Sequence, residues 1–317
     1  MEEFLRYILQ VTGAIDVTQE EEIQQLWSGY GTLYRLHLSG TDFPFAILKW
    51  IEPPMVSSHP RGWNTSFGNQ RKLKSYQVEA NWYKNYNKFC SHDLKYPKLY
   101  GFLEKKQLTL LIMEDLTCEG YQTKSEELSE VEVKNTLRWL AKFHAQFMGV
   151  QPDGLWEVGT YWHLDTRPEE LEKMENEILK ENASFFDRKL NECTYQTIIH
   201  GDAKQANFAY KDDQVAAFDF QYVGGGCGMK DVIYFLSSCL SEDQIKSLEG
   251  ELLGIYFSEL KKHLEGKYEK KHTEIEQEWR SLYAIAWADF ARFLNGWSPG
   301  HWKMNDYVGR QVQKVIG

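Results

Sequence analysis

Two stretches in the C-terminal half decide how this sequence folds: TIIHGDAKQANFAY, residues 197–210, and VAAFDFQYVGGG, residues 215–226. In the first, an apolar β-like run leads through a tight glycine turn to Asp202, and Asn207 precedes the strand-like FAY. The run QVAAFDF is typical of a hairpin partner for that strand, so we expect Asn207 and Asp219 to lie near each other. Their amide and carboxylate oxygens are ligands that magnesium prefers. Asp202 is then available to orient a hydroxyl, and phosphoryl transfer requires this set of side chains.

Length and composition agree with a globular, two-part protein. The chain has 317 residues, of which 42% are apolar and 15% aromatic, so it can bury a large core without disulfides or structural metals. Its formal net charge of −10 argues against a nucleic-acid partner, because phosphates select basic surfaces. Small neutral or cationic substrates are easier to accommodate.

The cysteines and the N-terminus indicate a cytoplasmic protein. The five cysteines show no CxxC pair and no zinc spacing, which predicts reduced thiols; they are Cys90, Cys118, Cys193, Cys227 and Cys239. The opening MEEFLRYILQVTGAID carries two acids and no apolar run of secretory length, and no stretch reaches about 18 apolar residues. We therefore expect no export signal and no membrane partner.

Local patterns divide the chain into two regions. Up to about residue 115 strand-like segments dominate, TLYRLHLSG, FPFAILKWIE and KLYGFLEKKQLTLLIME, with one helical segment, SYQVEANWYKNYNKF. Prolines and small polar residues in 52–72 argue against a regular element there. After residue 125 helices prevail; the first opens with a capping box at Ser129 and Glu132, and further helical patterns span 167–190 and 272–297.

The architecture predicted from these patterns is α+β, with a β-rich N-terminal lobe, residues 1–115, and a mostly helical C-terminal lobe, residues 116–317. Within it, H-x-D-x-x-x-x-N followed by D-F-Q resembles the protein-kinase-like superfamily, in the branch of aminoglycoside phosphotransferases, choline kinases and ecdysteroid kinase-like proteins. The run FDFQYVGGGCGMKDVIYFL is most similar to the ecdysteroid kinase-like group. The resemblance implies a two-lobed fold, with an antiparallel N-lobe sheet carrying one main helix.

The resemblance also implies a site that uses ATP and Mg²⁺ as cofactors. Asp202 matches the catalytic position, and Asn207 and Asp219 match the metal-binding positions. The ATP-anchoring lysine falls on Lys49 in FAILKW and its helical partner on Glu79 in YQVEANWY. The remaining cofactor-binding positions fall on Gly29 and Gly31 of the phosphate-covering hairpin, and on Glu114 and Leu116, whose backbone would face adenine.

The chain departs from the family pattern in two places. Tyr34 stands where the hairpin would carry its third glycine, so that loop has only two glycines with which to hold phosphate. Lys204 follows Asp202 by two residues, as in many protein kinases, and a cation there could neutralise the transferred phosphoryl group as a second catalytic residue. The alternative is a surface lysine beside the motif.

Several polar residues near the motif have structural interpretations. We expect the His200 ring to pack and hold the loop, and His144 to be a hydrogen-bonded core histidine on the apolar face of its helix. Asp231 would either cap the helix VIYFLSSCL or anchor the catalytic loop. The spacing of Trp279, Tyr283, Trp287, Phe290, Phe293 and Trp297 is typical of a core stripe. With Asp289 and Trp302 nearby, the same aromatics could instead hold a cationic substrate.

Two functions compete. The first is a small-molecule kinase that transfers the γ-phosphate of ATP to a hydroxyl, and the second is a nucleotide-binding pseudokinase without turnover; retention of Asp202, Asn207 and Asp219 favours the first. A protein kinase is disfavoured, because only eleven residues separate Asp219 from Asp231 and no A-P-E follows. A sterol-like alcohol, an amino alcohol and an aminoglycoside all remain possible acceptors, and the sequence indicates no oligomeric state.

Overall fold

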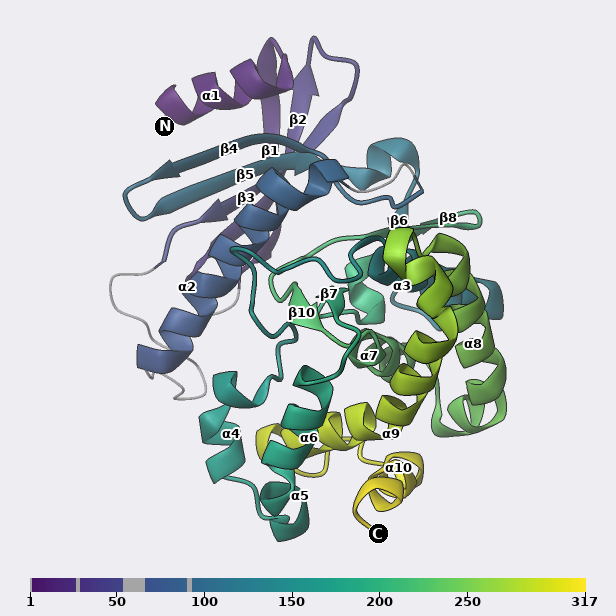
Figure 1. Ribbon diagram of the computed structural model, residues 1–317. Coiled ribbons are helices and arrows are strands. Elements are labelled where there is room, and N and C mark those ends of the chain that lie inside the picture. The colour runs from purple at the N-terminus through teal and green to yellow at the C-terminus, as the bar shows by residue number, and fades with distance from the viewer. Residues whose placement is uncertain (1, 27–28, 54–65, 90–92) are drawn as a thin grey trace. The chain divides into compact units, whose positions relative to one another are not determined.

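The computed structural model describes residues 2–26, 29–53, 66–89 and 93–317. Contacts divide the chain into two compact units. The first contains most of the chain up to Gln122, together with Ala216–Phe218, and the second contains Thr123–Val215 and Asp219–Gly317. The expected antiparallel sheet in the N-terminal part and the mostly helical C-terminal part are both confirmed (Figure 1).

The first unit is built on a five-stranded antiparallel sheet of order β1-β2-β3-β5-β4. Its elements are α1 (Glu2–Thr12), β1 (Asp16–Gln25), β2 (Gly31–Ser39), β3 (Phe45–Ile51), α2 (Ser66–Asn81), a π-helical turn (Trp82–Tyr86), a 3₁₀ turn (Asn87–Phe89), β4 (Leu99–Lys105), β5 (Leu108–Glu114) and a second 3₁₀ turn (Leu116–Glu119). The segment 98–114, expected as one strand-like stretch, is a hairpin that turns at Lys106, where φ is 54°.

The two faces of this sheet carry different chemistry because side chains alternate along each strand. Leu36, Leu48 and Ile112 join Ile8 of α1 in an apolar cluster on one face. Lys49, the next residue after Leu48 in β3, points to the opposite face and meets Glu79 of α2. The alternation of FAILKW therefore places an apolar core on one side of β3 and a charged pair on the other.

Helix α2 corrects one expectation. The sequence predicted no regular element over 52–72, but α2 begins at Ser66, so the last seven residues of that range are helical. The part of the range at 54–65 lies outside the described residues. The last proline of the stretch is Pro60, so the helix is free of the residue type that argued against it. The helical pattern expected from Ser75 onward is confirmed.

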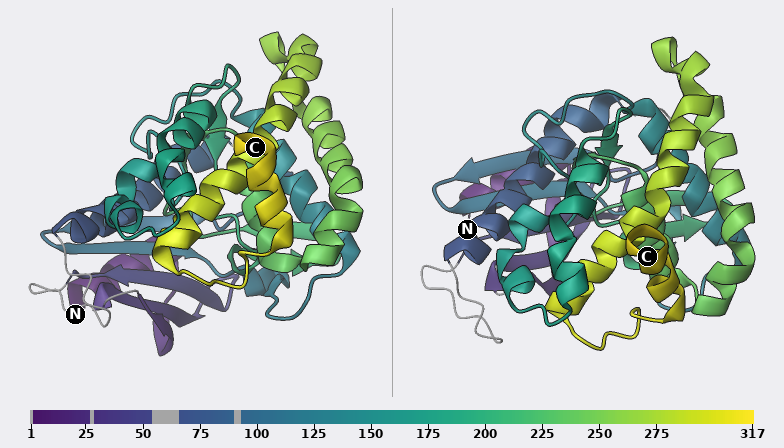
Figure 2. Two further views of the ribbon diagram at one scale, coloured as in Figure 1. Left: turned by 90° about the horizontal axis from the view of Figure 1, so that it is seen from below. Right: turned by 60° about the horizontal axis from the view of Figure 1, so that its bottom comes forward.

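The second unit is dominated by helices. They are α3 (Glu130–Gln146), α4 (Pro168–Glu172), α5 (Glu177–Glu181), α6 (Ala183–Asn191), α7 (Met229–Cys239), α8 (Glu242–His263), α9 (His272–Trp297) and α10 (Asp306–Ile316), with 3₁₀ turns at Leu164–Thr166, Gln205–Asn207 and Gly266–Lys271. The long helix α9 packs against α6, α7 and α10 (Figure 2). Its aromatic stripe supplies much of the core, since Trp279, Trp287 and Phe290 are fully buried.

Local sequence signals explain how the helices begin. The predicted capping box of α3 is confirmed: the Ser129 hydroxyl accepts from the Glu132 amide, and the Glu132 carboxylate accepts from the Ser129 amide. The pattern expected as one helix over 167–190 forms three short helices, and Asn176 caps the second of them through its side chain. No helix in the described ranges is both long and apolar enough to cross a bilayer.

The remaining strands are short: β6 (Gln122–Thr123), β7 (Thr197–Ile199), β8 (Phe208–Lys211), β9 (Gln214–Ala217) and β10 (Gly224–Gly226). Strands β8 and β9 are neighbours in one sheet, which confirms the hairpin expected between FAY and QVAAF. Strand β7 pairs antiparallel with β10, so Ile199 lies opposite Gly224. These two pairings hold both quoted stretches of the sequence in place.

Candidate active site

The turn after β7 depends on a glycine. Gly201 has a φ of +78°, and a Cβ atom at this position would lie 2.0 Å from the carbonyl oxygen of Tyr222. Only glycine tolerates both the backbone conformation and the close approach. The turn leads the chain from β7 directly to Asp202, and Gly201 is therefore required by the loop geometry itself.

Asp231, in the first turn of α7, anchors this loop. Its carboxylate accepts hydrogen bonds from the backbone amides of His200 (2.6 Å) and Gly201 (2.9 Å) and lies 3.1 Å from Nε2 of His144. Asp231 is completely buried. The expected anchoring role is thus confirmed, whereas the alternative of a helix cap is wrong, because α7 begins at Met229 and its N-cap residue is Gly228.

Both histidines are structural, as expected. His144 is fully buried, with Nδ1 2.8 Å from the Tyr256 hydroxyl and Nε2 on Asp231. The His200 ring packs in a tilted arrangement on Phe220, with ring centres 4.6 Å apart, and its Nδ1 accepts from the Asp202 amide at 3.3 Å. Neither ring nitrogen of His144 remains for proton transfer. The histidines instead fix the backbone that presents Asp202.

The loop brings three of the predicted site residues together. One carboxylate oxygen of Asp202, Oδ2, accepts from the Lys204 ammonium at 3.0 Å and from Nδ2 of Asn207 at 2.9 Å. Nδ2 of Asn207 also donates to the Asp202 carbonyl at 2.8 Å. The side chains of Asp202 and Asn207 are buried, and that of Lys204 is 37% exposed. Lys204 and Asn207 therefore both hold the Asp202 carboxylate at the same oxygen, Oδ2.

Burial and charge shift the proton affinities of this cluster. Burial raises the pKa of Asp202; the Lys204 ammonium opposes that rise, and the negative charge of Asp219 adds to it. For Lys204, burial lowers the pKa but the charges of Asp202 and Asp219 outweigh it, so the net pKa is raised. Asp219 thus lies close enough to Asp202 and Lys204 to affect both. A buried carboxylate with a raised pKa is a stronger base than an exposed one.

Asp219 occupies an unusual backbone conformation. Its φ is +65°, in the left-handed region that residues other than glycine seldom adopt, although Asp tolerates it better than most. Its Oδ1 accepts from the Gln221 side-chain amide at 2.7 Å, and the carboxyl group is partly exposed. Such strain costs on the order of 1 kcal/mol and is found most often at functional sites. The D-F-Q spacing carries the signal for Gln221, which the sequence reasoning did not assign to the site.

The donor atoms fit a magnesium ion. Both side-chain hydrogen bonds of Asn207 use its Nδ2, so its Oδ1 remains as an oxygen donor, and Asp219 supplies a partly exposed carboxylate. Neutral and anionic oxygens are the ligands that magnesium takes, usually with several waters. The chemistry of this pair therefore supports the expected metal position.

The first unit contains the predicted lysine pair. The Lys49 ammonium lies 2.9 Å from Oε1 and 2.6 Å from Oε2 of Glu79, and both side chains are buried. The thirty-residue separation between them is spanned by the chain that links β3 to α2. The structure thus brings together two residues that the sequence could associate only through a resemblance.

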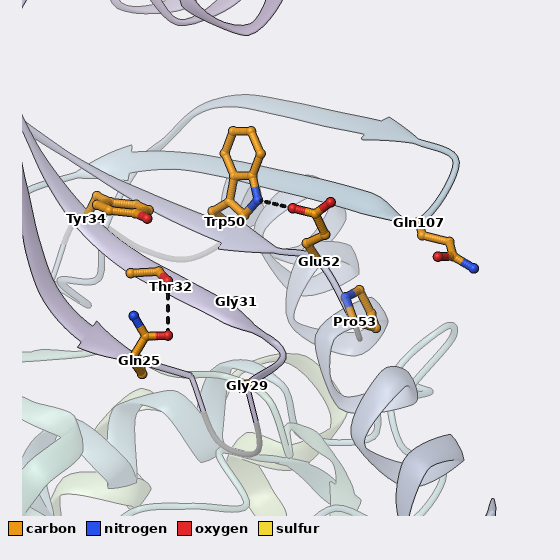
Figure 3. A pocket seen from close by; sticks show the side chains of 9 residues that line it. All are labelled: Gln25, Gly29, Gly31, Thr32, Tyr34, Trp50, Glu52, Pro53 and Gln107. Atoms are coloured by element: carbon orange, nitrogen blue, oxygen red, sulfur yellow. Dashed lines mark hydrogen bonds between the residues drawn. The ribbon is translucent and has the colours of Figure 1, made fainter. Parts of the chain in front are cut away.

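The two hairpin glycines border a cavity of about 600 Å³ (Figure 3). Its wall includes Trp50 and Tyr34 but neither Lys49 nor Glu79, and Trp50 packs on Phe4 of α1, so the cavity opens on the α1 face of the sheet. Gly31 is required by strand pairing: a Cβ there would lie 1.9 Å from the Trp50 carbonyl oxygen. At Gly29, with φ +71°, a Cβ would contact nothing within 4 Å. Gly31 therefore has a structural explanation, independent of phosphate binding.

Glu114 and Leu116 flank the turn after β5. The buried Glu114 carboxylate lies 2.9 and 3.0 Å from the Lys95 ammonium and accepts from the Lys98 amide at 3.1 Å. Burial raises the pKa of Glu114, although Lys95 opposes the rise. Leu116 begins a 3₁₀ turn capped by the Asp115 side chain. The Glu114 side chain thus holds the turn in shape, and substitutions of it should affect stability even if only its backbone meets a nucleotide.

The C-terminal aromatics divide into core and surface. Trp287 is buried and Trp297 stacks on Phe293, whereas Trp302 is 66% exposed. Asp289, considered above as a partner for a cationic substrate, is buried and engaged by Arg292 and the Trp162 indole. The core interpretation of the α9 stripe is therefore confirmed, and Trp302 alone among these tryptophans lies at the surface.

Comparison with known proteins agrees with this fold. The fold is similar to that of aminoglycoside phosphotransferase APH(4)-Ia, solved as a thermostable mutant in a ternary complex with ADP and hygromycin B (12% identity, 99% of each chain, TM-score 0.55). It is also similar to that of the amicoumacin kinase hAmiN, solved with AMP-PNP, Ca²⁺ and Ami (10% identity, 99% of this chain and 94% of that one, TM-score 0.55). No curated protein sequence matches the chain.

A family model matches more than half of the chain, over residues 70–153 and 156–267. These segments include Glu79, the loop of Asp202 and Asn207, and Asp219, whereas Lys49 and the hairpin glycines precede them. The resemblance noted from the sequence is thereby confirmed. The chain belongs to the ecdysteroid kinase-like family.

Proposed function

We propose that this protein is a magnesium-dependent phosphotransferase that moves the γ-phosphate of ATP to a hydroxyl group of a small molecule. The observation that carries the proposal is the arrangement around Asp202: a buried carboxylate with a raised pKa, held at Oδ2 by Lys204 and Asn207, with Asp219 near enough to influence it. A scaffold that only bound nucleotide would not need this cluster.

Asp202 is the group that we assign to the acceptor. Its Oδ1 would accept the hydrogen bond of the acceptor hydroxyl and then its proton, as the hydroxyl oxygen bonds to the γ-phosphorus and the bond from that phosphorus to the β,γ-bridging oxygen breaks. The products are a phosphate ester and ADP. Lys204, paired with Asp202 and partly exposed, would offer positive charge to the transferred group.

The remaining assignments concern the nucleotide and its metal. Asn207 Oδ1 and the Asp219 carboxylate would hold magnesium, and a bound magnesium ion would neutralise negative charge on the β- and γ-phosphates. Lys49, fixed by Glu79 at 2.6 Å, would hold the α- and β-phosphates, and the backbone of Glu114 and Leu116 would meet adenine. For Gly29 and Gly31 a role over the phosphates stays a prediction.

The experiment that tests this function is an ATP-consumption screen against pooled hydroxylated metabolites, including sterol-like alcohols, amino alcohols and aminoglycosides. Wild type and Asp202→Asn are compared, with Asp213→Asn as the control, because Asp213 is exposed and undergoes the same chemical change. We expect acceptor-dependent consumption in wild type and in the control only. Protection by ATP and magnesium against thermal unfolding, with no turnover in any pool and no slow hydrolysis, would instead support the pseudokinase.

A further inference from the structure

Lys303 lies between α9 and α10 in an aromatic setting. Its ammonium is 5.1 Å from the ring centre of Tyr234, 5.7 Å from that of Phe290 and 5.5 Å from that of Trp302. It donates a hydrogen bond of 3.3 Å to the hydroxyl of Ser237. We call this group of four side chains around Lys303 the Lys303 cage.

The ammonium has no carboxylate partner within the described part of the chain. The Lys303 ammonium has three N–H donors, of which one is used in the hydrogen bond to Ser237. The ring faces offer only weak acceptors for the others. The pKa of Lys303 is lowered to about 8; burial is the main cause and the charge of Lys204 adds to the lowering, against the opposite effects of Cys239 and Asp202. Lys303 is thus a cation that a negatively charged or strongly polar oxygen would stabilise.

The Lys303 cage adjoins the catalytic loop. The Tyr234 ring lies beneath Lys303, and the Tyr234 hydroxyl interacts with the Asp202 carboxylate and the Tyr161 hydroxyl. Burial raises the pKa of Tyr234, and these two interactions raise it further. The charges of Asp202 and Lys204 both reach the Lys303 ammonium. One aromatic ring therefore connects Lys303 to the carboxylate that we assign to the acceptor hydroxyl.

The position of Lys303 bears on the charge of the acceptor. Aromatic faces near an acid would suit a cationic ligand. Here the ring faces of Tyr234, Phe290 and Trp302 already surround a protein cation, and Asp289 is engaged by Arg292 at 2.7 and 2.9 Å. A cationic acceptor would meet like charge and a neutralised acid.

We propose that Lys303 is a specificity-determining residue that binds an anionic group of the acceptor and disfavours cationic acceptors. The inference rests on the proposed function and adds the charge class of its acceptor. Lys303 lies beyond the segments that match the family. The simpler alternative is a lysine that only covers apolar surface with its stem.

Three probes of matched shape test the proposal: 3-(hydroxymethyl)benzoate, 3-methylbenzyl alcohol and 3-(hydroxymethyl)benzylamine. They share one aromatic carbinol and carry a negative, zero or positive charge at the same ring position at neutral pH. Phosphorylation is followed by ADP release with ATP and magnesium. Binding is measured separately by calorimetric titration in the presence of ADP and magnesium, which requires no turnover.

Wild type is compared with Lys303→Met and Lys303→Glu, and Lys314→Glu serves as control because Lys314 is an exposed lysine of the same C-terminal region. We expect wild type and control to favour the benzoate over the benzylamine by about tenfold, in binding and in kcat/KM. Lys303→Met should bring the three probes to within about threefold, and Lys303→Glu should reverse the order. Lys303→Met keeps the apolar stem, so it remains informative if the glutamate variant does not fold.

The outcomes separate the two proposals. Turnover of any probe with an order that Lys303→Met leaves unchanged would overturn the role of Lys303 and keep the phosphotransferase. Charge-selective binding that is lost in Lys303→Met, without turnover of any probe, would support Lys303 and count against the phosphotransferase. Wild-type protein that prefers the benzylamine, or binds none of the probes, would overturn the inference.

Discussion

The anchoring of the Asp202 loop by Asp231 gives a quantitative prediction. Replacing Asp231 by asparagine keeps one carbonyl-type acceptor but turns the other oxygen into an NH₂ donor. The amides of His200 and Gly201 bond to different carboxylate oxygens, at 2.6 and 2.9 Å, so one of the two loses its acceptor. Both amides are buried, and the variant cannot repair the loss with water at no cost.

The magnitude follows from the kind of bond that is lost. A hydrogen bond to a charged acceptor contributes about 1.5–3 kcal/mol, and an unpaired buried amide costs about 1–3 kcal/mol. Removing a buried charge offsets part of this loss. We therefore expect the free energy of opening of the loop to fall by about 2–4 kcal/mol, which corresponds to amide exchange roughly 30- to 1,000-fold faster.

Hydrogen exchange measured by mass spectrometry on peptides covering 197–207 is the direct assay. Asp243→Asn is the control, because it makes the same change from Asp to Asn at a side chain that is 96% exposed. In the proposed reaction Asp231→Asn should lower kcat more than it raises the KM for ATP, because we expect Asp231 to position Asp202 without contacting the nucleotide. Exchange in Asp231→Asn within fivefold of wild type would show that the anchor contributes little to holding the loop.

Four further outcomes are expected. Asp202→Asn should lower turnover by about a hundred- to ten-thousand-fold and leave protection by ATP and magnesium in thermal unfolding nearly unchanged; a loss of protection would mean that Asp202 holds the nucleotide. Burial raises the pKa of Asp202, so the ionised carboxylate destabilises the folded state at pH values above that pKa, and Asp202→Asn should not lower the Tm at neutral pH. For the same reason, the kcat/KM of wild type should fall as the pH drops through a value above the pKa of ordinary aspartates. Asp219→Asn should abolish the magnesium-dependent part of ATP protection in the same thermal assay. Asparagine is chosen over alanine because it tolerates the φ of +65° better, so the fold should be kept. Unchanged protection would contradict the assignment of Asp219 as a metal ligand. Lys49→Met should lower the free energy of unfolding in urea by about 3 kcal/mol, because it breaks a buried ion pair. Lys105→Met breaks an ion pair of similar length at the surface and should have no measurable effect. Equal losses in the two variants would show that burial does not determine the contribution of these pairs.

The sequence determined the motif and its chemistry. The order of His200, Gly201, Asp202 and Asn207, with Asp219 in the following apolar run, sufficed to predict the loop, the hairpin and the family. These are local features, because spacing along a short turn fixes which side chains can converge. The capping box of α3 and the core nature of the α9 stripe were readable for the same reason.

Other features lay beyond the reach of local patterns. The sequence expected an irregular segment where α2 begins, because the prolines of 52–60 dominated the pattern, although α2 itself contains no proline. It also expected one helix over 167–190, where three short helices form. A helical pattern in the sequence does not by itself show where a helix begins or where it is interrupted.

Tertiary structure alone decided which long-range partners the polar residues would meet. Asp231 could have been a cap or an anchor until the fold placed it on the amides of His200 and Gly201, thirty or more residues earlier in the chain. Lys303 had no motif to mark it and was absent from the expected site; only the fold shows that α7 and α9 bring Tyr234 and Phe290 to it. A sequence records which charges a chain contains, but their burial and their partners are set by packing between distant segments, and it is burial and partners that determine what a charge does.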